Sequence, residues 1–184
     1  HMEAIKKSGV LVRLGLKPQK YLLLSAHREE NIDNEEHFLS LMESVNALAE
    51  KYQLPIIYSM HPRSKKFIEQ RKFRFHPLVR SMQPFGFLDY NHLQMNAYCV
   101  LSDSGTLSEE SAMLHFPAVL MRTSTERPEV LDKGTVVIGG IRGCDVEQAV
   151  ELAVSMFEND EETVMAEDYA DTNVSVKVVK IIQS

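Results

Sequence analysis

Several features common in other protein classes are scarce or absent in this sequence. It has no tryptophan and only two cysteines among 184 residues, and no Cys-x-x-Cys or paired Cys/His spacing predicts structural zinc. Cys99 lies inside an apolar run and is expected to be a buried thiol. No apolar run approaches the ~20 residues that a membrane-spanning helix needs, and no signal peptide is visible. We therefore expect a cytoplasmic protein without a metal or a membrane partner.

Positive charge is also in short supply. The chain has 20 Lys and Arg residues against 26 Asp and Glu residues, for a formal net charge of -6. This balance argues against a general nucleic-acid-binding protein, which needs a basic face for phosphates. A small anionic ligand is still compatible with the composition, because a few arginines and the N-terminus of a helix can bind it locally.

The sequence falls into three segments. The opening His1-Met2 is typical of a cloning remnant. Residues 3–20 form a short basic segment that we interpret as a lead-in or linker, and residues 21–184 are expected to form one domain. A chain of 184 residues with 44% hydrophobic residues is long enough for a domain with a sizeable core.

Within the domain, short apolar runs alternate with helical periodicity. This alternation predicts an α/β fold, a Rossmann-like doubly wound parallel sheet with helices on both faces. Asp89 or Asn91 is the expected N-cap of one helix. Strands are expected at residues 21–25, 55–60, 79–82, 97–102, 117–122 and 135–138, helices at 35–52, 65–71, 89–96, 106–114, 145–158 and 172–182, and a polar loop at 27–34.

The most informative segment follows the predicted strand at residues 97–102. It begins Ser102-Asp103-Ser104-Gly105-Thr106 and continues into a helix that carries Glu110. Gly105 lets a ligand approach the backbone, and Ser104 with the amides of Gly105 and Thr106 suits a diphosphate at the start of a helix. The carboxylate of Glu110 suits the hydroxyls of a sugar. The ordinary structural alternative is an N-cap at Ser104 or Thr106 with solvated glutamates.

Polar residues also follow three other predicted strands. His27 and Arg28 come after the first strand and suit a phosphate or an acid/base role, whereas a loop with an internal Arg–Glu pair is the structural alternative. His61 follows the second strand and is a weaker signal. Arg122 and Arg127 flank a Thr-Ser-Thr-Glu stretch after the strand at 117–122, where a surface ion pair is equally compatible.

Aromatic residues precede the strand at residues 97–102. Tyr90 is the better candidate for stacking on a nucleotide base, and core packing is expected for Phe85 and Phe87. In a parallel sheet these loops converge at the carboxyl edge. We therefore expect a nucleotide-sugar site there.

Taken together, these segments resemble the non-hydrolysing UDP-N-acetylglucosamine 2-epimerase family. The resemblance covers nearly the whole chain in order. It comprises Ser25-Ala26-His27-Arg28-Glu29-Glu30-Asn31, His61-Pro62, Ser102-Asp103-Ser104-Gly105-Thr106 with Glu109-Glu110, Pro117-Ala118-Val119-Leu120, Arg122-Thr123-Ser124-Thr125-Glu126-Arg127-Pro128-Glu129 and Gly134-Thr135.

The resemblance implies that this chain is the C-terminal, UDP-binding half of a GT-B type two-domain enzyme. It places His27 near the phosphates, Ser104, Gly105 and Thr106 around the diphosphate, and Glu110 on the ribose. The same resemblance places Tyr90 beside uracil, with Arg122 and Arg127 lining the cleft. It implies elimination and re-addition of UDP through a 2-acetamidoglycal, with no cofactor. Most catalytic carboxylates would come from a missing N-terminal domain, so His27 is the one catalytic candidate here.

Two departures from the usual family pattern refine this expectation. Thr106 stands where a second glycine is usual, and Glu29 stands where a second arginine is usual. These variants resemble the branch that makes UDP-N-acetyl-L-fucosamine by epimerising a 6-deoxytalose precursor for bacterial capsule and O-antigen synthesis. Alternatives are the nucleotide-sugar half of a GT-B glycosyltransferase and a non-catalytic nucleotide-sensing module. The apolar last helix further suggests a homo-oligomer in the full-length enzyme.

Overall fold

The computed structural model describes residues 1–122, 136–159 and 172–183. The described strands form one sheet of six, in the order β3-β2-β1-β4-β5-β6, and neighbouring strands are parallel. The expected α/β fold class is therefore confirmed. The strands are β1 (Leu22–Ser25), β2 (Ile56–Ser59), β3 (Val79–Met82), β4 (Cys99–Ser102), β5 (Ala118–Leu120) and β6 (Val137–Ile138).

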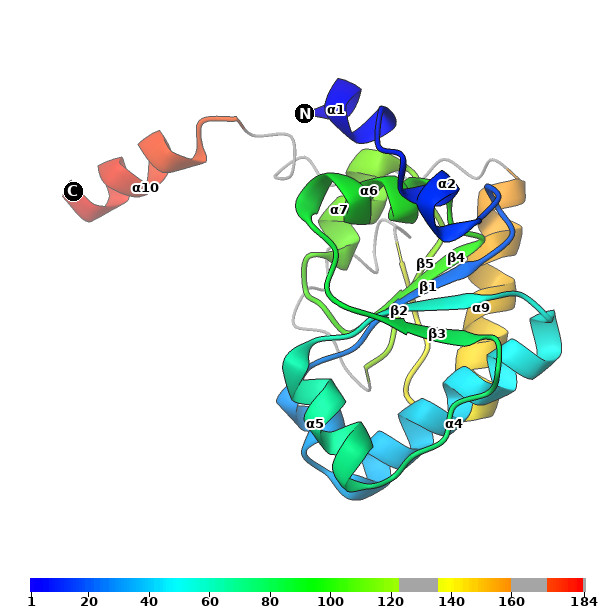
Figure 1. The fold of residues 1–184 in the computed structure, drawn as a ribbon. Helices are drawn as coiled ribbons and strands as arrows, with labels where there is room; N and C mark the ends of the chain where they lie inside the picture. The colour runs from blue at the N-terminus through cyan, green and yellow to red at the C-terminus, as the bar shows by residue number, and fades with distance from the viewer. Residues whose placement is uncertain (123–135, 160–171, 184) are drawn as a thin grey trace.

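Helices cover both faces of this sheet (Figure 1). One face packs against α4 and α9, and the other against α2, α6 and α7. The described helices are α1 (Met2–Lys6), α2 (Val10–Leu14), α3 (Glu29–Ile32), α4 (Glu35–Tyr52), α5 (Pro62–Gln70), α6 (Phe87–Asn96), α7 (Leu107–Leu114), α9 (Gly143–Glu158) and α10 (Val174–Gln183). No helix in the described ranges has the length and apolarity to cross a membrane.

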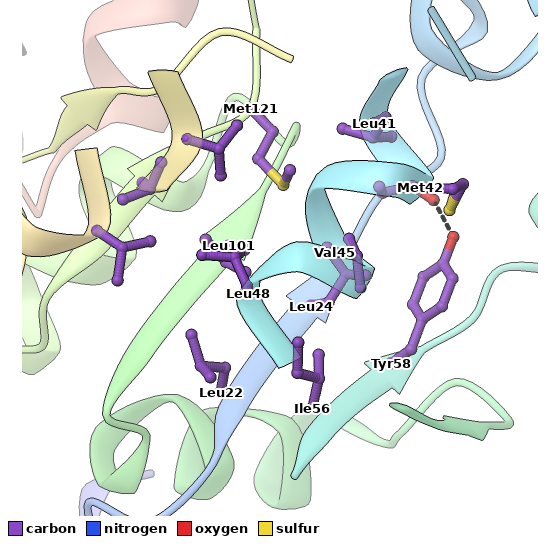
Figure 2. Packing of buried hydrophobic residues seen from close by; sticks show 14 of the residues in the cluster. Leu22, Leu24, Leu41, Met42, Val45, Leu48, Ile56, Tyr58, Leu101 and Met121 are labelled. Carbon is purple, nitrogen blue, oxygen red and sulfur yellow. Dashed lines mark hydrogen bonds between the residues drawn. The ribbon is translucent and has the colours of Figure 1, made fainter. Parts of the chain in front are cut away.

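The two-sided burial of β1 explains why its sequence is continuously apolar. Leu22 and Leu24 point to the face covered by α4 and α9, whereas Leu23 points to the opposite face. Figure 2 shows the first face, where side chains of α4 lie over β1, β2 and β4. The buried Tyr58 hydroxyl donates to the carbonyl oxygen of Ala26 at 3.0 Å, so this large side chain has no unsatisfied polar group.

The N-terminal segment differs from the expected lead-in or linker. Residues 3–20 include α1 and α2, and the side chains of Ile5, Val10 and Leu16 are buried. The basic residues of this segment face solvent, while Val10, Leu11, Leu14 and Leu16 join the core on the side of α6. The segment is thus packed on the domain, which its overall polarity conceals.

Two local predictions are wrong. The N-cap of α6 is Gly86, and Asp89 instead accepts hydrogen bonds from Ser8 and Arg13 of the N-terminal segment. The polar stretch at residues 27–34 is not all loop, because α3 forms within it. A carboxylate in the first turn of a helix interacts favourably with the helix dipole whether or not it caps, so sequence alone does not separate the two roles.

Gly139 provides a test of the packing between β5 and α9. A Cβ atom there would lie 2.6 Å from Cγ1 of Val119 and 3.1 Å from Cβ of Ala149. We expect Gly139→Ala to lower the free energy of unfolding by about 1–3 kcal/mol in urea denaturation, because the core cannot admit the extra methyl group.

Gly143 offers the matched control. It is the first residue of α9, and the nearest atom to its added Cβ is Cα of Ser44 at 4.0 Å. Gly143→Ala should change stability by no more than about 0.5 kcal/mol. Equal stability of the two variants would contradict the close approach of β5 and α9.

Candidate functional site

The site lies where the order of the strands reverses. The chain runs from β1 outward to β2 and β3, and then returns to β4 and continues outward on the other side to β5 and β6. Ser25 and Ser102 pair at the carboxyl ends of β1 and β4, so the two strands end level. The loops that leave them diverge, which opens the crevice where open α/β sheets bind ligands.

Asp103 joins the two loops at this crevice. Its side chain is fully buried, and its carboxylate accepts hydrogen bonds from the backbone N–H groups of His27 and Arg28, each at 2.9 Å to Oδ2. The side chain of Asn31 donates to the same oxygen at 3.2 Å and to the carbonyl of Met121 at 3.1 Å. A charged acceptor with several donors gives strong hydrogen bonds. Asp103 therefore fixes the positions of His27 and Arg28.

The turn before α7 is held by its own hydroxyl groups. Ser102 Oγ accepts from the amide of Ser104 at 3.1 Å, and the hydroxyls of Ser104 and Thr106 are 3.0 Å apart. The N-cap residue Thr106 makes no side-chain capping bond to the helix. A Cβ on Gly105 would lie 3.7 Å from Nη2 of Arg28, so the guanidinium group lies over the glycine of this turn.

A cavity of about 200 Å³ opens between these loops. It brings together five of the residues predicted from the sequence, from three separate segments of the chain. Its lining comprises Ser25, His27, Ser59, Phe85, Tyr90, Ser102, Ser104, Thr106 and Glu110. A neighbouring cavity of about 450 Å³ is lined by His27, Arg28, Glu29, Glu30, His61 and Arg63, so His27 borders both.

Two further side chains shape the first cavity. Burial raises the pKa of the Tyr90 phenol, which shares a hydrogen bond with Ser25, so Tyr90 stays neutral over the physiological pH range. The Glu110 carboxylate accepts from Thr106 Oγ1 at 2.9 Å. The cavity thus presents an aromatic ring and an anionic acceptor, and the Arg28 guanidinium lies close by over Gly105.

The ring of His27 is in a position to move protons. Its Nδ1 lies 3.5 Å from Oδ1 of Asp103, and the side chain is 41% exposed. The ring centroid of His61 is 5.5 Å away. A histidine beside a buried carboxylate and open to solvent can serve as a general acid or base or bind a phosphate.

Arg122 lies next to the second cavity, against Glu30. Its side chain is buried, and Nε donates to Glu30 Oε1 at 3.1 Å, so Arg122 lines neither of the two cavities. Arg122 contacts the second cavity indirectly, because its partner Glu30 is one of the residues that line that cavity. Arg127 lies outside the described residues, as does the whole stretch 123–135.

Several site residues were missed in the sequence. The role of Asp103 could not be seen in its motif, because it depends on backbone amides 75 and 76 positions away in the chain. Ser59 ends β2, and its position at a strand end was the available signal. Phe85 lines the cavity and Phe87 is exposed, so core packing was the wrong prediction for Phe87.

Comparison with known proteins agrees with this geometry. Residues 1–183 match the family model described as UDP-N-acetylglucosamine 2-epimerase. The chain belongs to this family. A Methanococcus maripaludis UDP-N-acetylglucosamine 2-epimerase is 38% identical over 128 residues, which are 67% of this chain and 35% of that protein.

Solved structures of the family superpose on nearly the whole chain. The Rickettsia bellii UDP-N-acetylglucosamine 2-epimerase matches with a TM-score of 0.80 and 35% identity, over 99% of this chain and 49% of that one. The Methanocaldococcus jannaschii UDP-GlcNAc 2-epimerase in complex with UDP-GlcNAc and UDP matches with a TM-score of 0.81 and 28% identity. The match covers 99% of this chain and 50% of that one. The chain therefore spans about half the length of these two solved proteins. This is the length expected of one half of a GT-B type fold.

The described residues offer no metal centre. In residues 1–122, 136–159 and 172–183, no three His, Cys, Asp or Glu side chains lie close enough together to hold a metal ion. Cys99 is buried as expected, and Cys144 is an exposed thiol. The polar groups that line the two cavities are instead hydroxyls, the carboxylates of three glutamates, two histidines and two arginines.

Asp103→Asn tests whether this carboxylate organises the site. We expect the free energy of unfolding to fall by about 1.5–3 kcal/mol, because the neutral amide cannot accept from all three donors. Hydrogen exchange at the amides of His27 and Arg28 should accelerate. Glu43→Gln, an exposed residue of α4, is the matched control, and unchanged exchange at His27 and Arg28 in Asp103→Asn would refute the assignment.

Proposed function

We propose that this chain is the UDP-binding half of a UDP-N-acetylhexosamine C2-epimerase, and that residues 21–184 form the binding domain. The observation that carries the proposal is the cavity at the β1/β4 switch point. It joins an aromatic ring, a carboxylate and small hydroxyls, with Arg28 close by, in a chain of the epimerase family. The complex of a related epimerase with UDP-GlcNAc and UDP supports the ligand class.

In this proposal each part of UDP meets a different part of the site. The turn at Ser104, Gly105 and Thr106 and the loop of His27 and Arg28 surround the diphosphate. These two segments already approach each other, since the Arg28 guanidinium lies over Gly105. An N-terminal helix turn and a guanidinium are both suited to phosphate.

The remaining parts of the ligand would extend along α6 and α7. Glu110 would accept from the ribose hydroxyls, and Tyr90 would stack on uracil, since both line the same cavity. Arg127 is proposed as a further diphosphate contact. For Arg122, the contact with Glu30 supports an indirect role behind the loop.

The proposed reaction begins when a base removes the proton at C2 of the sugar. The C1–O bond breaks, and UDP leaves with the electron pair as a 2-acetamidoglycal forms. UDP then adds back to C1 while C2 receives a proton on the opposite face. The contribution of this half is to stabilise the charge on the leaving diphosphate through Arg28, His27 and the start of α7.

His27 is the proposed proton-transfer residue of this half. The remaining acid and base groups are proposed to lie in an N-terminal domain, so this chain alone is expected to bind UDP without epimerising a sugar. We further propose a cytoplasmic, homo-oligomeric full-length enzyme. Thr106 and Glu29 favour the UDP-N-acetyl-L-fucosamine branch of bacterial capsule and O-antigen synthesis.

Titration calorimetry with UDP tests the binding site. Arg28→Leu should weaken UDP binding about tenfold or more, because a charge-assisted contact to the diphosphate is lost. Arg74→Leu makes the same charge change at an exposed residue of another region and should leave the affinity unchanged. Absence of both heat and thermal protection with the wild-type chain would instead support a nucleotide-independent module.

The reaction class is tested with the full-length protein. Incubation with a UDP-N-acetylhexosamine and no acceptor should give the C2 epimer, with solvent deuterium incorporated at C2 because the proton is exchanged during elimination. The 184-residue chain alone should give none. Sugar transfer that occurs only with an acceptor would support the glycosyltransferase alternative.

A further inference from the structure

Glu110 is held by side chains from two different helices. Its Oε1 accepts from Thr106 Oγ1 at 2.9 Å, and its Oε2 accepts from Gln94 Nε2 at 2.5 Å. Thr106 precedes α7, and Gln94 comes from the neighbouring helix α6. The carboxylate therefore has a fixed orientation at the edge of the cavity that it lines.

Gln94 is an unusual residue for its surroundings. The side chain is fully buried, and its Oε1 has no hydrogen-bond partner within the described part of the chain. An unpaired buried amide oxygen costs free energy, and an apolar side chain of the same length would avoid that cost. In the described part of the chain, the amide nitrogen donates to Glu110. Because a carboxylate only accepts, that contact also fixes which end of the amide faces it.

The side chain of Thr106 has a role that the sequence did not predict. A hydroxyl has a single proton to donate, and Thr106 directs it to Glu110. Its side chain is therefore occupied in the described structure, and its backbone N–H donates to Ser104 Oγ at 3.4 Å. The side chain of the threonine at this turn thus acts on Glu110, whereas a glycine there would offer Glu110 no donor.

The carboxylate retains capacity for a ligand. Its two oxygens offer about four acceptor positions, and the contacts with Thr106 and Gln94 use one on each oxygen. Each oxygen can therefore accept one further hydrogen bond, and Glu110 lines the cavity. Two adjacent hydroxyl groups of a ribose can donate to such a pair, whereas a sugar without them cannot.

We propose that Gln94 and Thr106 are positioning residues that aim Glu110 at the 2′- and 3′-hydroxyls of a ribonucleotide, so that the site rejects nucleotides without this diol. The inference rests on the proposed function, because it takes a nucleoside diphosphate as the ligand. A purely structural tie between α6 and α7 is the competing explanation, and the two differ in how nucleotide selectivity responds to substitution.

The test compares UDP with 2′,3′-dideoxy-UDP by titration calorimetry on the 184-residue chain. Wild type should prefer UDP. Gln94→Met and Thr106→Val should each weaken UDP binding about tenfold, the loss expected when a charged acceptor is no longer held in place. The affinity for 2′,3′-dideoxy-UDP should stay the same in both variants. Thr106→Ser keeps the donor and should retain the wild-type preference.

Gln148→Met is the matched control, because Gln148 is exposed on α9 away from the cavity. Equal losses for the two nucleotides, or no loss for either, would overturn the inference. If Gln94→Met does not fold, Thr106→Val decides, since Thr106 is exposed and its substitution leaves the core intact. A wild type that binds both nucleotides equally overturns this inference alone, whereas one that binds neither overturns the proposed function as well.

Discussion

The site depends on a buried carboxylate that crosses the switch point of the sheet. Asp103 leaves β4 and accepts from two backbone amides of the loop after β1, which places His27 and Arg28 opposite the turn that starts α7. This contact helps to set the separation of the two loops. Burying a carboxylate is costly unless donors surround it, and here Asn31 supplies a third donor that also ties in the end of β5 through Met121.

The remaining features of the crevice follow from that constraint. The Arg28 guanidinium lies over Gly105, where a backbone without side chain leaves room for it and for an anion. Beyond the turn, α7 carries Glu110, and the buried Gln94 and exposed Thr106 orient its carboxylate. The crevice thus has a guanidinium group beside the turn and a carboxylate acceptor one turn into α7. A ligand with a diphosphate next to a pair of hydroxyl groups matches this arrangement.

Prediction from sequence worked where a local pattern reflects a local cause. The buried strands could be located because a strand buried on both faces has a continuous apolar run. The long helix α4 could be located because a helix buried on one face has apolar residues with a 3.6-residue period. It worked less well where a residue serves a distant partner. The sequence predicts Asp89 or Asn91 as a helix cap, but Asp89 accepts hydrogen bonds from Ser8 and Arg13. It also predicts a lead-in or linker at residues 3–20, where Val10 is buried in the core on the side of α6.

The sequence by itself determined the fold class, the family and the segments that meet at the crevice, because strand-end loops in a parallel sheet always share one edge. The tertiary structure decided the assignments within that edge. It showed that Arg122 is buried against Glu30, that Asp103 is the organising residue, and that Thr106 and Gln94 act on Glu110. The reason is physical: which acceptor a donor finds depends on the packing of helices that are distant in the chain, and no spacing of residues encodes that distance.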